Sequence, residues 1–158
     1  INDYTATGGL PPKSIRVFVY GGDDAEIAQA IFDTKPAGIQ TYGSIQATAY
    51  DQDGNPYTIY FERPTAVNIY VDVSITSDGA AIDVQEVKDA IKAYINNLSI
   101  GEDIIYAKVL AAVMGIKGVA DATVYIDTVS PPAGTSNIAI ADSEVAQTDD
   151  TLITVTVS

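Results

Sequence analysis

The sequence predicts an α+β protein made of two small lobes, each with a mixed or mainly antiparallel sheet packed against helices. Three observations indicate this fold class. Residues 83–116 have the pattern of two helices in series with a strand on either side, and strands and helices follow one another without strict β-α-β alternation. In addition, 158 residues with 47% hydrophobic content suit one domain or two small lobes. We expect β-α-β-β in residues 1–64 and β-α-α-β-β-β in residues 65–158.

The N-terminal lobe begins with a polar segment rich in Gly and Pro, residues 1–12, which predicts an extended lead-in. The alternating run from Ser14 to Tyr20 predicts a strand. Asp23 with Glu26 three residues later forms a capping box, so a short helix begins there. This helix must end before Pro36, because proline disfavours the helical conformation in the residue that precedes it.

A β-hairpin is predicted in the second half of this lobe. Residues 38–43 have the composition of a turn-rich connection, and the runs Ser44 to Tyr50 and Tyr57 to Glu62 alternate as strands do. Gly54 lies between the two runs and can take the positive φ that a tight turn requires.

The C-terminal lobe opens with the clearest alternation in the chain, from Val67 to Ile75, which predicts a strand with one buried and one wet face. An amphipathic helix then begins at Asp83, which forms a second capping box with Glu86. A second helix is predicted to begin near Gly101 to Asp103, where acidic side chains favour a helix N-terminus.

The second helix is expected to end at Gly115 or Gly118. Three further strands are expected beyond it, at Ala122 to Asp127, Ile138 to Ala141 and Leu152 to Val157, with a proline-containing loop at residues 129–136 after the first of them.

Composition excludes several classes of function. Eight basic and twenty-one acidic residues give a formal charge of −13, which opposes binding to nucleic acid and to anionic lipid and favours basic protein partners. No apolar run approaches the roughly 20 residues that a membrane span needs. The chain has no Cys and no His, so thiolate chemistry is absent and the usual general base and zinc ligand are missing. We expect no enzyme activity and no cofactor.

One stretch resembles a calcium-binding loop. Asp51, Asp53, Asn55 and Glu62 match the first, third, fifth and twelfth positions of such a loop. However, Pro56 stands where the loop needs Gly for its sharp turn, and the flanking segments have the pattern of strands rather than helices. A solvated hairpin turn is therefore the favoured interpretation, and no metal site is expected.

Other polar motifs are also better explained by local structure. Gly21-Gly22 before a helix could hold a phosphate, but Asp23 and Asp24 place negative charge at that helix end. Acidic pairs could supply the two carboxylates of a glycosidase. Two of these pairs, however, lie at predicted helix starts, where acidic residues are expected for electrostatic reasons alone. The pairs are Asp23/Asp24, Glu102/Asp103 and Asp149/Asp150.

The chain has ten tyrosines and no tryptophan, and Tyr50, Tyr57, Tyr60 and Tyr70 lie on the predicted hairpin and the strand after it. Tyrosine is enriched at protein interfaces because it combines a large apolar area with a polar tip. These four are therefore candidate interaction residues, although ordinary half-buried strand packing explains them equally well. If Tyr50, Tyr60 and Tyr70 share a face, they could also stack on sugars.

The stretch GGDDAEIAQAIFDTKPAGIQTYG at residues 21–43 resembles the baseplate J-like family of contractile-tailed bacteriophages and prophages. Four other stretches resemble the same family in the same order. They are GLPPKSIRVFVY, YTIYFERPTAVNIYV, INNLSIGEDIIYAKVLAAVMGIKGV and NIAIADSEVAQTDDTLITVTVS. None of these motifs is catalytic, so their number and order carry the resemblance.

The resemblance implies a structural subunit of the tail baseplate. Such a subunit contributes to the wedges around the central hub, helps to hold the sheath and tube before contraction, and contacts other wedge proteins and copies of itself. It would be assembled in the bacterial host cytoplasm. Family members are usually longer at the N-terminus, so we expect a C-terminal portion with Ser158 near the natural end. The alternative function is a carbohydrate-binding or adhesion module that uses the tyrosines.

Overall fold

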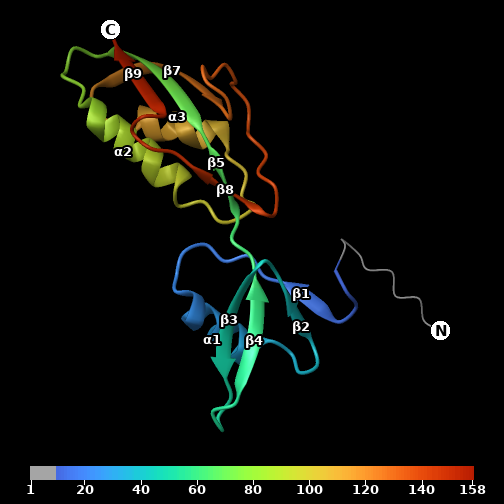
Figure 1. Cartoon of the computed structure of the whole chain (residues 1–158). Helices are drawn as coiled ribbons and strands as arrows, with labels where there is room; N and C mark the ends of the chain where they lie inside the picture. The colour runs from blue at the N-terminus through green and yellow to red at the C-terminus, as the bar shows by residue number, and fades with distance from the viewer. Residues whose placement is uncertain (1–9) are drawn as a thin grey trace. The chain divides into compact units, whose positions relative to one another are not determined.

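The computed structural model describes residues 10–158, and it confirms the α+β class. The chain divides into two compact units, Ile1–Pro64 and Thr65–Ser158, which we call the N-terminal and C-terminal units. Most of the predicted lead-in, residues 1–12, lies outside the described residues. Figure 1 shows the elements of each unit.

The helix of the N-terminal unit begins where the sequence predicts. Helix α1 (Asp24–Thr34) is capped by Asp23, whose carboxylate accepts hydrogen bonds from the backbone N–H groups of Ala25 and Glu26. This cap satisfies two of the free N–H groups at the helix start. The helix ends before Pro36, as expected.

The predicted hairpin is confirmed. Strands β3 (Ile45–Tyr50) and β4 (Pro56–Phe61) pair antiparallel, with Gly54 at a φ of 82° in the turn between them. One face of the hairpin packs on α1. The core between them consists of small and large apolar side chains: Ala28, Ile31, Ala49, Ile59 and Phe61.

The expected strand from Ser14 to Tyr20 is divided between two partners. Strand β1 covers only Ser14–Arg16 and pairs in parallel with β2 (Gln40–Tyr42), which forms in the segment predicted as a turn-rich connection. Beyond Arg16 the chain pairs instead with Glu62, just after β4, whose N–H donates to the Val17 carbonyl oxygen at 2.9 Å. The expected strand is therefore shorter, because its second half leaves β2 for the end of β4.

The C-terminal unit is a three-stranded sheet in the order β7-β6-β9, with two helices against one face (Figure 1). The strands are β6 (Tyr70–Ser77), β7 (Val119–Asp127) and β9 (Ile153–Val157), and the helices are α2 (Val84–Ile95) and α3 (Tyr106–Met114). β6 pairs antiparallel with β7 and parallel with β9. The core lies between the helices and the inner residues of the sheet, including Val73, Ile91 and Val109, all fully buried.

Helix α2 has the predicted cap, since the Asp83 carboxylate accepts from the N–H groups of Gln85 and Glu86. Helix α3 begins later than predicted. Asp103 does not cap it but accepts from the backbone N–H of Ile140 at 2.9 Å. The first turn is instead capped by a distant residue, because the Tyr106 N–H donates to Asn137 Oδ1 at 3.0 Å. The helix ends at Gly115, one of the two expected positions.

The strand predicted from Val67 to Ile75 is interrupted. Its first part belongs to β5 (Thr65–Asn68), which pairs in parallel with β8 (Glu144–Gln147), and its second part is β6. The strands that pair with β5 and β6 are β8 and β9, and they are joined by residues 148–152, which we call the 148–152 loop. The buried Thr148 bridges the gap, because its hydroxyl donates to the Ile69 carbonyl oxygen at 2.8 Å.

The prediction of a strand at Ile138 to Ala141 is wrong. This segment forms only an isolated bridge between Ile138 and Ile104, whereas the C-terminal partner of β5 is β8. A short apolar run predicts a strand only if a neighbouring strand edge is available. Here the free edge of β5 lies beside residues 144–147, so the hydrogen bonds between strands form with these residues.

Candidate interaction surfaces

The turn of the hairpin is held together by Asp51. Its Oδ1 accepts from the backbone N–H groups of Asp53 and Asn55, at 3.0 and 2.8 Å, and its Oδ2 accepts from the Asn55 side-chain amide at 3.0 Å. Hydrogen bonds from the Asn55 side chain and backbone hold the pKa of Asp51 below its usual value. The carboxylate therefore acts as an Asx-type turn former, which is a structural role.

The structure does not bring Glu62 to the other members of the calcium-loop motif. Glu62 follows Phe61, which pairs with Ile45 at the end of the strands opposite the turn, roughly 15–20 Å along the strand from Asp51. Its carboxylate accepts from the Ser44 hydroxyl at 2.6 Å. Residues 10–158 contain no group of three or more acidic side chains arranged to hold a metal ion.

The candidate tyrosines lie on three different surfaces. Tyr57 is on the helix side of the hairpin, where its ring contacts Phe32 with the ring centroids 4.8 Å apart. Tyr50 and Tyr60 alternate with the buried positions and project from the opposite face, 55% and 38% exposed. Tyr70 is half-buried at the start of β6 in the C-terminal unit. The tyrosines of the hairpin therefore do not form one continuous face.

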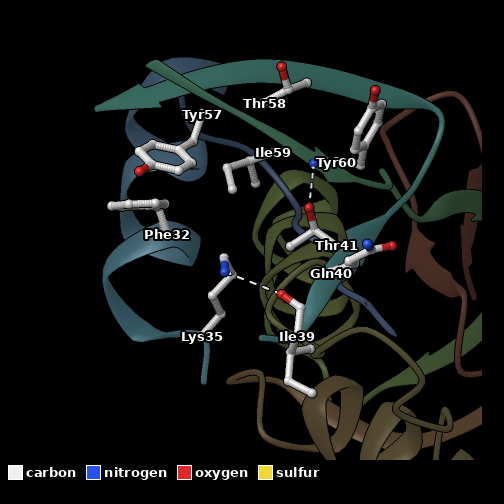
Figure 2. Close-up of a pocket in the computed structure, with 9 residues that line it drawn as sticks. All are labelled: Phe32, Lys35, Ile39, Gln40, Thr41, Tyr57, Thr58, Ile59 and Tyr60. Carbon is white, nitrogen blue, oxygen red and sulfur yellow. Dashed lines mark hydrogen bonds between the residues drawn. The ribbon is translucent and has the colours of Figure 1, made fainter. Parts of the chain in front are cut away.

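A groove of about 400 Å³ lies beside Tyr57 in the N-terminal unit, between the end of α1, β2 and the outer edge of β4 (Figure 2). Its walls are fixed by two contacts. The Lys35 ammonium donates to the Ile39 carbonyl oxygen at 3.2 Å, and the backbone N–H of Tyr60 donates to the Thr41 hydroxyl at 2.9 Å. The described lining mixes apolar and polar side chains and has no nucleophile paired with a base, so its chemistry is suited to contact rather than to catalysis.

The acidic pairs of the N-terminal unit and of the second helix have structural partners. Asp23 caps α1, and the adjacent Asp24 forms an ion pair with Arg63 at 2.7 Å. Glu102 accepts from the backbone N–H of Ser99 at 2.9 Å, and Asp103 accepts from Ile140 as described above. These carboxylates are therefore used to close turns and fix neighbouring segments.

The third acidic pair attaches the 148–152 loop to α2. The Lys92 ammonium lies 2.6 Å from Asp150 Oδ1 and 2.8 Å from Asp89 Oδ1. The bond from Lys92 is the main reason that the pKa of Asp150 is lowered, and the same contacts raise the pKa of Lys92. Asp149 closes the loop itself by accepting from the hydroxyl and N–H of Thr151. Part of the polar side of α2 is thus already occupied by this loop.

The comparison with known protein families decides the identity of the chain. Residues 67–158 match the family model for the baseplate J-like protein C-terminal domain. The chain belongs to the baseplate J-like family. The matched region starts two residues after the first residue of the C-terminal unit and extends to the end of the chain, so it covers almost all of that unit. The comparison with curated proteins found no match.

Membership of this family confirms the resemblance seen in the sequence and gives a structural role in the phage tail baseplate. The protein interacts there with other tail proteins. None of the helices within residues 10–158 has the length and apolar character that a membrane crossing requires.

One surface of this baseplate J-like protein is not evident from single residues in the sequence. The sheet of the C-terminal unit exposes the face opposite the helices, with Tyr70 and Asp72 on β6 and Tyr125 and Asp127 on β7. The sequence signal that could have identified this surface is the alternation of polar and apolar side chains in residues 121–127. It indicates which residues share a face, but the pairing of β6 with β7 is needed to bring the two sets together.

Proposed function

We propose that this protein is a non-catalytic subunit of the wedges around the central hub of a contractile tail, in a phage or a prophage. In this role it helps to hold the sheath and tube in the state that precedes contraction, and it is assembled in the bacterial host cytoplasm. The observation that carries the proposal is the match of residues 67–158 to the C-terminal domain of baseplate J-like proteins.

The use of the acidic side chains supports a non-catalytic role. The carboxylates of the three acidic pairs, which are the candidates for general acid and base chemistry, form helix caps, turns and ion pairs. A catalytic carboxylate pair instead requires two groups facing a common cavity with different pKa values. The pKa values of Asp149 and Asp150 are both lowered.

The contacts of this subunit with other wedge proteins and with copies of itself are assigned in this proposal to exposed tyrosine-bearing surfaces. In the N-terminal unit these are the outward hairpin face with Tyr50 and Tyr60 and the groove beside Tyr57. In the C-terminal unit the surface is the sheet face with Tyr70, which we assign to contacts with other wedge proteins rather than with a second copy. Tyrosine suits such contacts because it buries a large area at low entropic cost.

The test is electron microscopy of tail particles purified from the induced host and labelled with an antibody against this protein. We expect gold label at the sheath-distal end of the tail. Particles from a host in which the gene is deleted serve as the control, and a plasmid copy should restore both label and intact tails. Intact, unlabelled tails in the deletion host would refute the wedge role.

A further inference from the structure

The sheet of the C-terminal unit has one face that no other element of this unit covers. Helices α2 and α3 both pack on the side of Val73 and Val124, which are fully buried. The alternate residues of β6, β7 and β9 therefore project away from the helices. We call this surface the open face; it includes Tyr70, Asp72, Asp121, Tyr125, Asp127 and Thr154.

Tyrosine and aspartate alternate on the open face in both directions. In the strand register Tyr70 lies opposite Asp127, and Asp72 lies opposite Tyr125. Side chains directly opposite each other are about 5 Å apart at Cβ, and residues two apart along a strand are about 7 Å apart. Each aromatic ring therefore has one carboxylate across the strands and another along its own strand.

Positive charge is absent from the open face. The C-terminal unit has four lysines and thirteen acidic residues. Lys88 and Lys92 are on α2, where they hold Asp150; Lys108 is on α3, with its ammonium 5.9 Å from the Tyr94 ring; and Lys117 follows α3. Within residues 65–158, therefore, every cation belongs to the helix layer or to the turn after it.

The carboxylates of this face have no cationic partner within the described residues. Asp121 and Asp127 each accept only a hydrogen bond from the following backbone N–H, and Asp72 forms none with another side chain. Tyr125 is 39% exposed, so its ring is accessible to a partner. The face thus presents negative charges and aromatic rings that the unit itself does not use.

We propose that the open face binds an arginine-bearing surface of another baseplate protein. A guanidinium group can stack on the ring of Tyr70 or Tyr125 while its N–H groups pair with the neighbouring Asp127 or Asp72. Arginine fits better than lysine because its planar group makes both contacts at once. This inference rests on the proposed function, since it names one contact surface of the wedge subunit.

A second copy of this chain is a poor occupant of the open face. The chain has only two arginines, Arg16 and Arg63. Arg63 is already bonded to Asp24 and to the carbonyl oxygens of Gly21 and Gly22, and the Arg16 guanidinium lies 5.3 Å from the Tyr42 ring centre. Two chains of formal charge −13 also repel each other. A basic partner of a different sequence satisfies the charges that a second copy cannot.

The first test is a titration of the isotope-labelled full chain with a hexa-arginine peptide, followed by NMR. We expect saturable shifts at the amides around Asp72 and Tyr125, with weaker binding of hexa-lysine and none of a hexa-citrulline peptide. The double variant Asp72→Asn/Asp127→Asn should bind hexa-arginine at least tenfold more weakly. The matched control, Glu86→Gln/Asp142→Asn, loses the same charge away from the face and should bind within twofold of the parent.

Equal weakening in both double variants, or shifts centred on another surface, would overturn the proposal by showing that only net charge matters.

The second test places p-benzoylphenylalanine at Ser74, in the middle of the face, and at Glu86 on α2 as a control, and irradiates assembled particles. Cross-links from Ser74 should reach an arginine-containing segment of another tail protein. Cross-links to a second copy, or none from Ser74 in particles that contain the protein, contradict it.

The two tests separate the open-face proposal from the wedge assignment. If the protein is absent from particles, the proposed function fails while the peptide titration still decides whether the face recognises arginine. If the protein is in particles but its open face gives no arginine-dependent binding, only the present inference fails.

Discussion

Asn96 forms a two-bond clamp whose removal should destabilise the C-terminal unit. It lies at the end of α2 and pairs with the backbone of Thr148 at the start of the 148–152 loop. Its side-chain amide donates to the Thr148 carbonyl oxygen at 3.0 Å, and its side-chain oxygen accepts from the Thr148 N–H at 2.9 Å. Asn96→Ala removes both bonds at a point where the chain passes from one strand pairing to the next.

The expected cost follows from these two bonds. A hydrogen bond within a folded protein contributes about 0.5–1.5 kcal/mol net, so the pair contributes about 1–3 kcal/mol. Thr148 is only 6% exposed, which limits the access of water to its freed backbone groups. The unit should therefore lose stability near the upper part of this range, without losing its fold.

Urea denaturation of the full chain, followed by circular dichroism, measures this loss. With a slope of about 1 kcal/mol per M for a unit of this size, the midpoint of the C-terminal unit should fall by about 1–3 M. Hydrogen exchange adds a local readout. The amide of Thr148, which forms one bond of the clamp, and the amide of Val71, which donates to the Leu152 carbonyl oxygen at the other end of the loop, should exchange faster in the variant than in the parent protein.

The neighbouring Asn97 provides a matched control. Its side chain donates to the Ala93 carbonyl oxygen, one turn back on the same helix, and that bond is exposed. Asn97→Ala makes the same chemical change just beyond the end of α2 but removes only this exposed bond, so it should shift the midpoint little. If Asn96→Ala and Asn97→Ala behave alike, the clamp does not stabilise the unit and the reasoning is refuted.

Three further predictions concern other parts of the chain. Gly43→Ala should destabilise the N-terminal unit by about 1–3 kcal/mol or more, because a Cβ there would lie nearer than 3.0 Å to the Phe61 backbone; an unchanged urea midpoint contradicts this. Ile91→Ala in the core should cost about 2–5 kcal/mol. The exposed Val84→Ala on the same helix should cost about 0.5 kcal/mol or less, and equal losses argue against the assigned core. The pKa of Asp150 in the folded protein is lowered from 3.8, so the contribution of this carboxylate to folding stability is complete above that pH. This contribution disappears as the pH falls through the lower pKa of the folded state. Asp150→Asn should therefore reduce the loss of stability between about pH 5 and pH 2, and an unchanged pH profile contradicts the ion pair with Lys92.

Local chemistry in the sequence predicted the elements that depend on neighbouring residues alone. Asp23 and Asp83 start helices because each carboxylate reaches N–H groups two and three residues ahead. Gly54 allows the hairpin turn because it tolerates positive φ. The amphipathic pattern of α2 identified its buried face, and the family resemblance identified the structural class. The role of Tyr50, Tyr57, Tyr60 and Tyr70 in contacts stays a prediction.

Elements that depend on distant partners were not accessible from the sequence. Helix α3 begins at Tyr106 rather than near Gly101 to Asp103, and its first N–H group donates to Asn137, thirty-one residues away, which local sequence does not indicate. The strand expected at Ile138 to Ala141 is absent, and a strand that pairs with β5 forms instead at residues 144–147, where the chain lies beside β5.

The same physical reason applies to the surfaces. Alternation shows which residues of one strand share a face, but strand pairing decides which residues of different strands become neighbours. Alternation thus places Tyr57 and Tyr60 on opposite faces of β4, whereas register joined Tyr70 with Asp127 on the open face. The sequence by itself determined the starts of α1 and α2, the hairpin turn and the family, whereas only the tertiary structure decided where α3 begins and which side chains form a common surface.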